Sequence, residues 1–452
     1  MMNTQNAELG TCNTKRHGKR GAPAQALMIS AYHACSIPAF HVWPSLQKYC
    51  HIFPPISVIR VAMNQRFYSL DVFRGATVAL MILVNNPGSW SHIYAPLEHA
   101  PWHGATPTDL VFPFFLFAVG NALAFVMPRL EAAGTKVFLQ KVIKRTILIF
   151  VIGLFLNWWP FVRWNNGDLI FKYWVDPGNP ENGIRILGVL QRIALAYFFA
   201  SLVIYFFKIR GAFLVATILL LLYWWLCLAF GDLADPFSMQ GWFGNEIDRT
   251  VLGVAHMYKG EGVPFEPEGI ASTLPAIVQV IFGYFVGDYI QKKGKNTEML
   301  TNLFVAGCLF IFTALCWEMV FPINKKIWTS SYVVYTTGLA ILVLSIMIYL
   351  IEFRNQRGAW TKFFDVFGKN PLFIFFLSGF LPRLLALLRW QDHVDAEGKP
   401  AYTSALPWFY QYVCKPLFTN PRNGSFIYAI ILIFFYWAIC FWLDKKKIYI
   451  KV

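Results

Sequence analysis

The sequence predicts an all-α, polytopic integral membrane protein with about ten transmembrane helices. Of its 452 residues, 57% are hydrophobic and 14% are charged, whereas soluble domains average about 45–50% apolar and about 25% charged residues. Phe, Trp and Tyr make up 18% of the chain, and Trp and Tyr are typical of the belts at membrane interfaces. A soluble fold could not bury this much apolar surface, so we predict that most of the chain lies in a bilayer.

Apolar runs follow one another along most of the chain. Each run is about 17–24 residues long, which as a helix covers a bilayer core of about 30 Å. The predicted spans are 70–87, 108–127, 142–160, 185–207, 211–230, 271–290, 301–321, 332–352, 369–388 and 425–443. Residues 1–62 are mixed in composition and contain no run long enough to span. We therefore expect a poorly ordered or spurious extension over 1–62 and a transmembrane domain over 63–452.

Positive charge alternates between the connections and predicts their orientation. One set of connections is short and basic, and contains Arg129, Lys136 and Lys141; Lys208 and Arg210; Lys292, Lys293 and Lys295; Arg354, Arg357 and Lys362; and Lys445, Lys446 and Lys447. The other set is longer and poor in basic residues, and comprises 88–107, 161–184, 231–270, 322–331 and 389–424. The positive-inside rule places the first set and both termini in the cytoplasm. The net charge of +15 then reflects orientation, and nucleic acid is not an expected partner.

Polar side chains gather in the first outer connection, between the first two spans. Asn85 ends the first span, His99 and His103 follow, and Asp109 opens the second. A histidine can act as a general base near neutral pH, and a carboxylate can orient it. The same residues also fit a simple helix start, with Thr106 or Thr108 as its cap. Both interpretations remain open on the sequence alone.

Charged residues also lie within or beside other predicted spans. Asp71 and Arg74 stand at the cytoplasmic start of the first span, where Arg74 could meet a phosphate-bearing ligand. Arg192 lies inside the fourth span, where an ionised arginine costs about 2.5–3.5 kcal/mol and so usually faces a cavity or a partner. Its alternative role is a structural pair with Glu268 or Asp109. Glu268 itself precedes the sixth span and also fits a surface acid near a helix start.

The common soluble-enzyme motifs are missing from the sequence. It contains no P-loop, Rossmann glycine pattern, zincin motif or nucleophile elbow. Its eight cysteines form no CxxC and no Cys/His metal spacing, so we expect no metal. The residues alone therefore favour either an integral membrane enzyme or a transporter or flippase of sugars.

Several blocks in order resemble the transmembrane heparan-α-glucosaminide N-acetyltransferase family. The resemblance runs from about Arg66 to the C-terminus. The blocks are Ser69-Leu-Asp71-Val-Phe-Arg74-Gly75, His99-Ala-Pro-Trp102-His-Gly104, Asp109-Leu-Val-Phe-Pro113-Phe-Phe, Leu187-Gly-Val-Leu-Gln191-Arg192-Ile, Glu266-Pro-Glu268-Gly269-Ile-Ala-Ser-Thr273 and Gly368-Lys-Asn370-Pro371-Leu. The second and third blocks together are the most specific.

The resemblance implies acetyl transfer from cytoplasmic acetyl-CoA, as a co-substrate, to an amine of glucosamine on the far side of the membrane. It places the active histidine on His99 and the active-site asparagine on Asn85. The expected site residues are His99, Asn85 and Asp109 for catalysis; Arg74, Asp71, Gln191 and Arg192 for acetyl-CoA; and Asn86, Trp102, His103 and Glu268 for the sugar.

The expected setting is a bacterial inner membrane with the histidine loop in the periplasm. Lysosomal members of the family carry a lumenal N-terminal region and an extra first span that this sequence does not show. We therefore expect a periplasmic amino sugar or oligosaccharide as acceptor in place of heparan sulfate. Membrane lipid is a further expected partner, and a homodimer is an open alternative. O-acylation of an envelope glycan is the rival reaction among enzymes.

Overall fold

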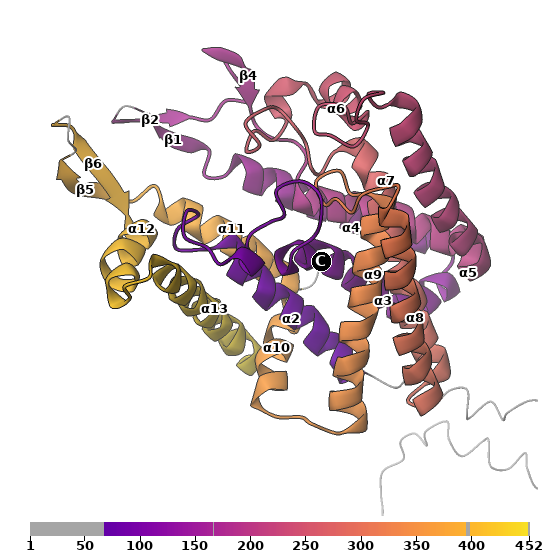
Figure 1. Ribbon diagram of the computed structural model, residues 1–452. Coiled ribbons are helices and arrows are strands. Elements are labelled where there is room, and N and C mark those ends of the chain that lie inside the picture. Colours follow the sequence, from indigo (N-terminus) through magenta and orange to yellow (C-terminus); the bar gives the residue numbers. More distant parts are fainter. Residues whose placement is uncertain (1–66, 166, 395–397, 451–452) are drawn as a thin grey trace, which may run out of the picture. The chain divides into compact units, whose positions relative to one another are not determined.

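The computed structural model describes residues 67–165, 167–394 and 398–450, and these are mainly helical, as Figure 1 shows. The α-helices are α2 (Tyr68–Asn85), α3 (Val111–Ala132), α4 (Thr135–Trp158), α5 (Val189–Phe230), α6 (Gly244–Leu252), α7 (Ile270–Lys293), α8 (Thr297–Glu318), α9 (Ser330–Ile348), α10 (Ala359–Lys369), α11 (Pro371–Leu385), α12 (Ala405–Phe409) and α13 (Pro421–Lys445). The all-α class is therefore confirmed. The predicted extension over 1–62 lies outside the described residues, so the domain boundary stays a prediction.

Short strands occur in the long connections and form antiparallel hairpins. They are β1 (Val162–Asn165), β2 (Asp168–Phe171), β3 (Val175–Asp176), β4 (Asn179–Gly183), β5 (Arg389–Val394) and β6 (Pro400–Ser404). β1 pairs with β2, β3 with β4, and β5 with β6. The β1–β2 and β5–β6 hairpins project from the helices in Figure 1, and the three hairpins extend the connections without changing the helical class.

In the described residues, seven helices are long and apolar enough to cross a membrane. An eighth is counted if α10 and α11, which meet at a 78° bend, form one broken span. The predicted count of ten is thus not confirmed. One difference is that α5 is counted as one helix, whereas two spans, 185–207 and 211–230, were predicted in its place. The backbone of α5 is non-helical at Lys208, with φ 55° and ψ −172°, close to the boundary between these two predicted spans. The other difference is that α4, which covers most of predicted span 142–160, is not among the seven helices. Its sequence includes the basic residues Lys141, Lys144 and Arg145.

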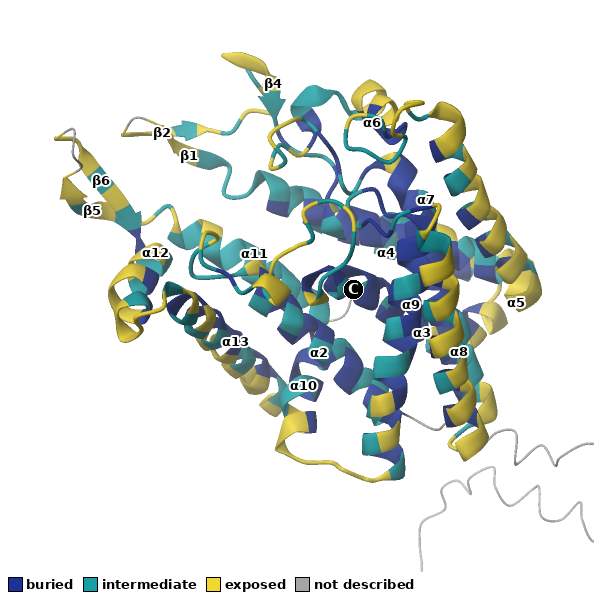
Figure 2. Ribbon diagram, viewed as in Figure 1, coloured by how far each residue is buried: buried dark blue, intermediate teal, exposed yellow. Residues whose placement is uncertain are grey.

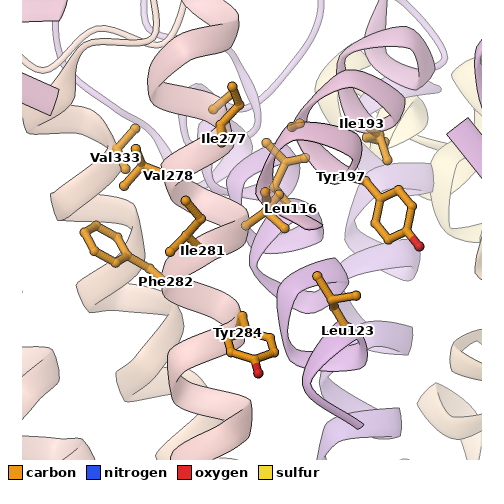
Figure 3. Packing of buried hydrophobic residues seen from close by; sticks show 14 of the residues in the cluster. Leu116, Leu123, Ile193, Tyr197, Ile277, Val278, Ile281, Phe282, Tyr284 and Val333 are labelled. Carbon is orange, nitrogen blue, oxygen red and sulfur yellow. The ribbon is translucent and has the colours of Figure 1, made fainter. Parts of the chain in front are cut away.

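Helices α3 and α7 pack closely and form the centre of the largest hydrophobic cluster. Leu116 of α3, Ile281 of α7, Ile193 of α5 and Val333 of α9 all belong to this cluster, which Figure 3 shows from close by. The apolar part of α7 is 83% buried, whereas that of α5 is 22% and that of α8 is 28% buried. The outward faces of α5 and α8 are accordingly exposed in Figure 2. Apolar faces left uncovered by protein are the ones that a bilayer would cover.

Two glycines set the close approach of α3 and α7. A Cβ on Gly120 would lie 2.0 Å from the carbonyl oxygen of Val280, and a Cβ on Gly283 would lie 2.1 Å from that of Phe117. Small residues allow such backbone contact between membrane helices, where packing replaces the hydrophobic driving force. The α3–α7 contact therefore depends on glycine on both helices.

Hydrogen bonds join the long connections to one another at one end of the helices. Trp102 Nε1 donates to the carbonyl of Phe237 at 2.9 Å, and Gly104 N donates to that of Ile323 at 2.7 Å. Trp164 Nε1 donates to the carbonyl of Leu387 at 3.1 Å. We call this end of the helices the loop end. It contains connections 86–106, 159–188, 231–269, 319–329 and 386–420. This grouping matches the predicted outer set, while its side of the membrane stays a prediction.

The first prediction concerns the α3–α7 contact. Gly283→Val is expected to lower the free energy of unfolding by about 1–3 kcal/mol, because the new side chain meets backbone that cannot move aside. Thermal unfolding of the purified protein in detergent measures the effect. Gly358→Ala is the matched control, since a Cβ there meets no atom within 4 Å. Equal melting temperatures for the two variants would contradict the assigned role of Gly283.

Candidate active site

His99 and Asp109 form a hydrogen-bonded pair at the loop end. His99 lies in the connection after α2, and Asp109 lies in a short 3₁₀ helix, η3 (Pro107–Leu110), which leads into α3. The His99 Nδ1 and Asp109 Oδ1 atoms are 2.6 Å apart. The Asp109 side chain is only 1% exposed, whereas that of His99 is 42% exposed. A proton on Nδ1 is needed to bond the carboxylate, so the lone pair of the neutral imidazole lies on Nε2.

The other carboxylate oxygen of Asp109 holds the surrounding loop. Asp109 Oδ2 accepts hydrogen bonds from Ala100 N at 3.0 Å, Thr106 N at 3.0 Å and Thr106 Oγ1 at 3.1 Å. Thr106 is the N-cap of η3, and its bond from N to Asp109 is half of a capping box. Of the two predicted caps, the structure therefore uses Thr106. The helix-start and histidine-orienting interpretations hold together, because one carboxylate does both.

Lys325 is a third member of this group, and the sequence analysis did not identify it. Its Nζ lies 3.0 Å from His99 Nδ1, 3.5 Å from His99 Nε2 and 3.3 Å from Asp109 Oδ1. Burial lowers the pKa of Lys325, and the negative charges of Asp109 and Glu268 oppose that effect. The neighbouring Asn324 fixes the turn by accepting a hydrogen bond from Ile327 N at 3.1 Å. Lys325 thus places a basic group directly beside the histidine–carboxylate pair.

The pair lines a cavity of about 400 Å³, which we call the histidine cavity. This volume lies within the usual range of small-molecule sites, about 300–1,000 Å³. Asn85, at the end of α2, lines it together with His99 and Asp109, and is exposed. Aromatic and charged side chains complete the wall: Trp90, Tyr258, Trp328, Arg185, Glu261, Glu268, Lys325 and Lys326. The cavity can therefore hold a polar ligand against both apolar faces and charged groups.

Glu268 faces the histidine cavity in an ion-pair cluster with Arg185. Arg185 donates to Glu268 and to both carboxylate oxygens of Glu266, with Nε 2.9 Å from Glu266 Oε2. Burial alone would lower the pKa of Arg185, but the two carboxylates outweigh it and raise that pKa. Burial alone would likewise raise the pKa of Glu268, but Arg185 and Arg192 bring it below its usual value. The pair therefore stays ionised at the cavity wall.

Arg192 is buried behind this wall and does not form the predicted pair. Its guanidinium donates to Ser272 Oγ and to the carbonyl of Gly269 at 3.3 Å, and lies 5.0 Å from the Trp328 ring centre. Among the described residues Arg192 makes no ion pair. Glu268 is paired with Arg185, and Asp109 is paired with His99 and Lys325. Arg192 supports the wall through Trp328 and the start of α7.

A second site lies near the start of α2, at the far end of that helix from Asn85. Asp71 and Arg74 line a cavity of about 820 Å³ there, together with Arg357, Asp365 and Lys369; we call it the basic cavity. Arg74 Nε donates to the carbonyl of Gly368 at 2.8 Å, and its Nη2 lies 2.5 Å from Asp71 Oδ1. Since a helix rises about 1.5 Å per residue, Arg74 and Asn85 are about 16 Å apart along α2.

The remaining expected site residues fall in different places. Asn86 and Gln191 line a further cavity of about 350 Å³ beside the histidine cavity. Trp102 and His103, expected to bind the sugar, are not among the residues that line any of these three cavities. Trp102 instead bonds the 231–269 connection, and His103 Nδ1 lies 3.4 Å from Asn324 Nδ2. Both residues join loops in this structure.

Sequence reasoning missed Lys325, Lys326, Arg185, Tyr258 and Glu261. The two adjacent lysines carried a usable signal, because they stand in a predicted outer connection where the positive-inside rule expects few basic residues. Arg185 precedes the Leu187–Arg192 block by two positions and could have been considered with it. Tyr258 and Glu261 lie in a long connection without a pattern that singles them out.

The fold and site define a class: a polytopic helical membrane protein with a histidine–carboxylate pair in a polar cavity at its loop end. No protein-family model matches the chain. Two curated proteins are similar to it, both named heparan-alpha-glucosaminide N-acetyltransferase. The Mus musculus protein is 27% identical over 395 residues, which cover 74% of this chain and 57% of that protein. The Homo sapiens protein is 27% identical over 353 residues, covering 66% and 50% respectively.

The similarity confirms the resemblance that the sequence blocks indicated. The chain spans about half the length of the curated relatives it matches. The positions of the catalytic, acetyl-CoA and sugar residues are untested by this similarity and stay predictions.

The second prediction concerns Asp248 of α6, which anchors the start of α7 beside Glu268. Its Oδ1 accepts from Ile270 N at 2.8 Å, while its buried Oδ2 has no hydrogen-bond partner among the described residues. Burial raises the pKa of Asp248 to about 7, above about 3.9 in an unfolded chain. The folded state therefore binds an extra proton between these values. Stability should fall as pH rises through that window, by at most about 1.4 kcal/mol per pH unit.

Thermal unfolding between pH 5 and pH 8 tests this effect. Asp248→Asn should remove part of the loss of stability at the higher pH, because the amide keeps the bond to Ile270 without a charge. The control is Asp232→Asn in the same connection, where the carboxylate is exposed and accepts from Ala234 N at 2.9 Å. Parallel pH curves for wild type and Asp248→Asn would show that the assigned proton is absent.

Proposed function

We propose that the chain is a transmembrane N-acetyltransferase. It moves acetyl from cytoplasmic acetyl-CoA to the amine of a glucosamine-type sugar on the outer side of the membrane. The observation that carries the proposal is the His99–Asp109 pair, with Lys325 beside it, lining a 400 Å³ cavity at the loop end. Similarity to two N-acetyltransferases supports the reaction type.

The basic cavity suits the nucleotide end of acetyl-CoA. It is lined by three cations, each of which is paired with a carboxylate and would share its charge with a phosphate: Arg74 with Asp71, Arg357 with Glu352, and Lys369 with Asp365 and Asp444. Tyr68 and Tyr449 supply aromatic rings nearby. The cavity opens near the start of α2, beside connections that the positive-inside rule assigns to the cytoplasm. The acyl arm then runs along α2 and α3. Ala118 of α3 lines the basic cavity, and Phe115, one helical turn away, lines the histidine cavity.

The chemistry at the histidine cavity follows from the pair. The sugar amine attacks the thioester carbonyl, a C–N bond forms, and His99 Nε2 accepts the proton that the nitrogen loses. The C–S bond then breaks, and His99 returns that proton to the departing thiolate of CoA. Asn85 donates a hydrogen bond to the oxyanion, a contact worth about 3–4 kcal/mol in comparable sites. In an alternative order of steps, His99 first takes the acetyl group from the thioester and then passes it to the sugar amine.

The third prediction is that His99→Ala lowers kcat at least about a hundredfold, because general-base catalysis is lost. Acetyl transfer to glucosamine is measured in membranes and in detergent, through release of free CoA and the N-acetylated product. His92→Ala is the control: His92 belongs to the same connection, contacts Ser89 Oγ at 3.3 Å and does not line the histidine cavity. Full activity of His99→Ala would exclude the mechanism.

The same assay separates the rival functions. A transporter or flippase would release no CoA when the sugar is added, and an O-acyltransferase would give an ester in place of an amide. Rapid quenching after the protein is mixed with acetyl-CoA alone tests the order of steps in which His99 carries the acetyl group. In that order, an acetyl group on His99 would appear before any acceptor is present.

The fourth prediction concerns the donor. Arg74→Gln should raise the KM for acetyl-CoA about tenfold, because one charged contact to phosphate is lost, while the KM for the sugar stays the same. Arg129→Gln is the control, since Arg129 is exposed near the α3–α4 turn and does not line the basic cavity. An increase confined to the KM of the sugar would place the donor elsewhere.

A further inference from the structure

Helix α4 carries a groove of about 770 Å³ on its outer surface, and all the residues that line this groove come from α4. They recur every three or four positions and so share one face of the helix. They are Lys136, Leu139, Gln140, Ile143, Lys144, Ile147, Leu148 and Val151. Ile147 is 57% exposed and Val151 is 53% exposed, although both side chains are apolar. We call this surface the α4 groove.

The α4 groove is polar in one half and apolar in the other. Lys136 lies in the first turn of α4 and Lys144 lies two turns further on, whereas residues 147–151 supply only apolar side chains to the groove. The last residue of α4, Trp158, donates through Nε1 to the carbonyl of Lys172 at 2.8 Å, in a connection of the loop end. The polar half of the groove therefore lies away from the loop end.

The polar half extends into the depth of a bilayer. Tryptophan is typical of membrane interfaces, and Trp158 lies at the loop end of α4. Measured along the helix from Trp158, Lys144 is about 21 Å away and Lys136 about 33 Å away, against a hydrocarbon core of about 30 Å. The backbone of Lys144 thus lies within the core, and its side chain extends toward the headgroups near Lys136. A charge at this depth usually has a partner.

The described part of the chain supplies no acidic partner for the basic residues of α4. Helix α4 contains no Asp or Glu, and none of its basic residues forms an ion pair with another described residue. These basic residues are Lys136, Lys141, Lys144 and Arg145. The buried Nε of Arg145 also lacks a hydrogen-bond partner among the described residues. On the neighbouring helix, by contrast, Lys208 pairs with Glu131 at 3.0 Å.

An anionic phospholipid complements both halves of the groove. Ammonium groups form charge-assisted hydrogen bonds with phosphate oxygens, and anionic lipids attract basic residues at the membrane surface. A zwitterionic phospholipid brings no net charge to the lysines. A second copy of the chain, placed symmetrically on the same face, would bring the lysines of the two copies together, and like charges repel. Charge therefore favours an anionic lipid over both alternatives.

We propose that the α4 groove is a binding site for an anionic phospholipid. The phosphate lies between Lys136 and Lys144, and an acyl chain lies along Ile143, Ile147 and Val151. The lipid comes from the leaflet opposite the loop end, and its charge offsets the cost of basic residues in a membrane-spanning helix. This inference is independent of the proposed function, because the α4 groove shares no lining residue with the histidine cavity or the basic cavity.

The fifth prediction uses photoreactive lipids and the full-length protein in vesicles of phosphatidylcholine. A diazirine on the acyl chain is carried either by phosphatidylglycerol or by phosphatidylcholine, and mass spectrometry locates the labelled peptides. In wild type, segment 136–151 should take at least about tenfold more label from phosphatidylglycerol, because each lysine near an anionic headgroup adds about fivefold in affinity. The double variant Lys136→Gln/Lys144→Gln should lower this ratio at least about fivefold.

Two further variants are the controls. Lys136→Arg/Lys144→Arg keeps both charges and should keep the wild-type ratio. Lys445→Gln/Lys446→Gln removes two exposed lysines at the end of α13 that lies away from the loop end, and should also keep that ratio. Both lysines of the α4 groove are exposed, so their replacement leaves the packing of the helices unchanged.

Three outcomes would overturn the proposal. The first is equal labelling of segment 136–151 by the two lipids in wild type. The second is a loss of the ratio in Lys445→Gln/Lys446→Gln as large as in Lys136→Gln/Lys144→Gln, because the lipid would then respond to the general basic surface. The third is cross-linking of segment 136–151 to a second copy of the chain without lipid label, which would assign the groove to an interface between copies.

Discussion

The buried carboxylate of Asp109 is the constraint on which the site depends. Its two oxygens contact His99, Ala100 and Thr106 of connection 86–106 and Lys325 of connection 319–329. A buried charge is costly unless every lone pair is used, and removing one partner of such a group commonly costs about 3–5 kcal/mol. The loop that carries His99 and the turn that carries Lys325 are therefore held in place by the same group that orients the imidazole.

The helices explain why the site sits at one end of a membrane-embedded body. The close α3–α7 contact at Gly120 and Gly283 fixes α3, and η3 places Asp109 at the start of that helix. Helix α2 then runs from the basic cavity to the histidine cavity, so Arg74 and Asn85 are separated by most of one helix length. A loop on a soluble domain could orient a histidine equally well, but it would not connect two sides of a bilayer.

The sequence predicted the helical class and the proximity of His99 to Asp109 because both are local. Apolar runs of bilayer length specify helices, and His99 and Asp109 are ten positions apart in one connection. Lys325 is 226 positions from His99, and only the packing of the α8–α9 connection onto the first loop brings them together. Trp102 and His103 show the same limit: polar and aromatic residues of one loop can bind a ligand or another loop. Both make contacts between loops in this structure, and their expected role in sugar binding stays a prediction.

Arg192 shows how the same ambiguity extends to buried charge. Its place in an apolar helix indicated a partner or a cavity, and the sequence offered Glu268 and Asp109 as acids. In the structure, Glu268 pairs with Arg185, and Asp109 pairs with His99 and Lys325. Arg192 instead contacts Trp328 and the start of α7. An arginine so placed still acts on the site, because its charge helps to hold Glu268 ionised while its guanidinium supports the Trp328 face of the histidine cavity. The buried charge of Arg192 thus stabilises the charge of Glu268 at the cavity wall.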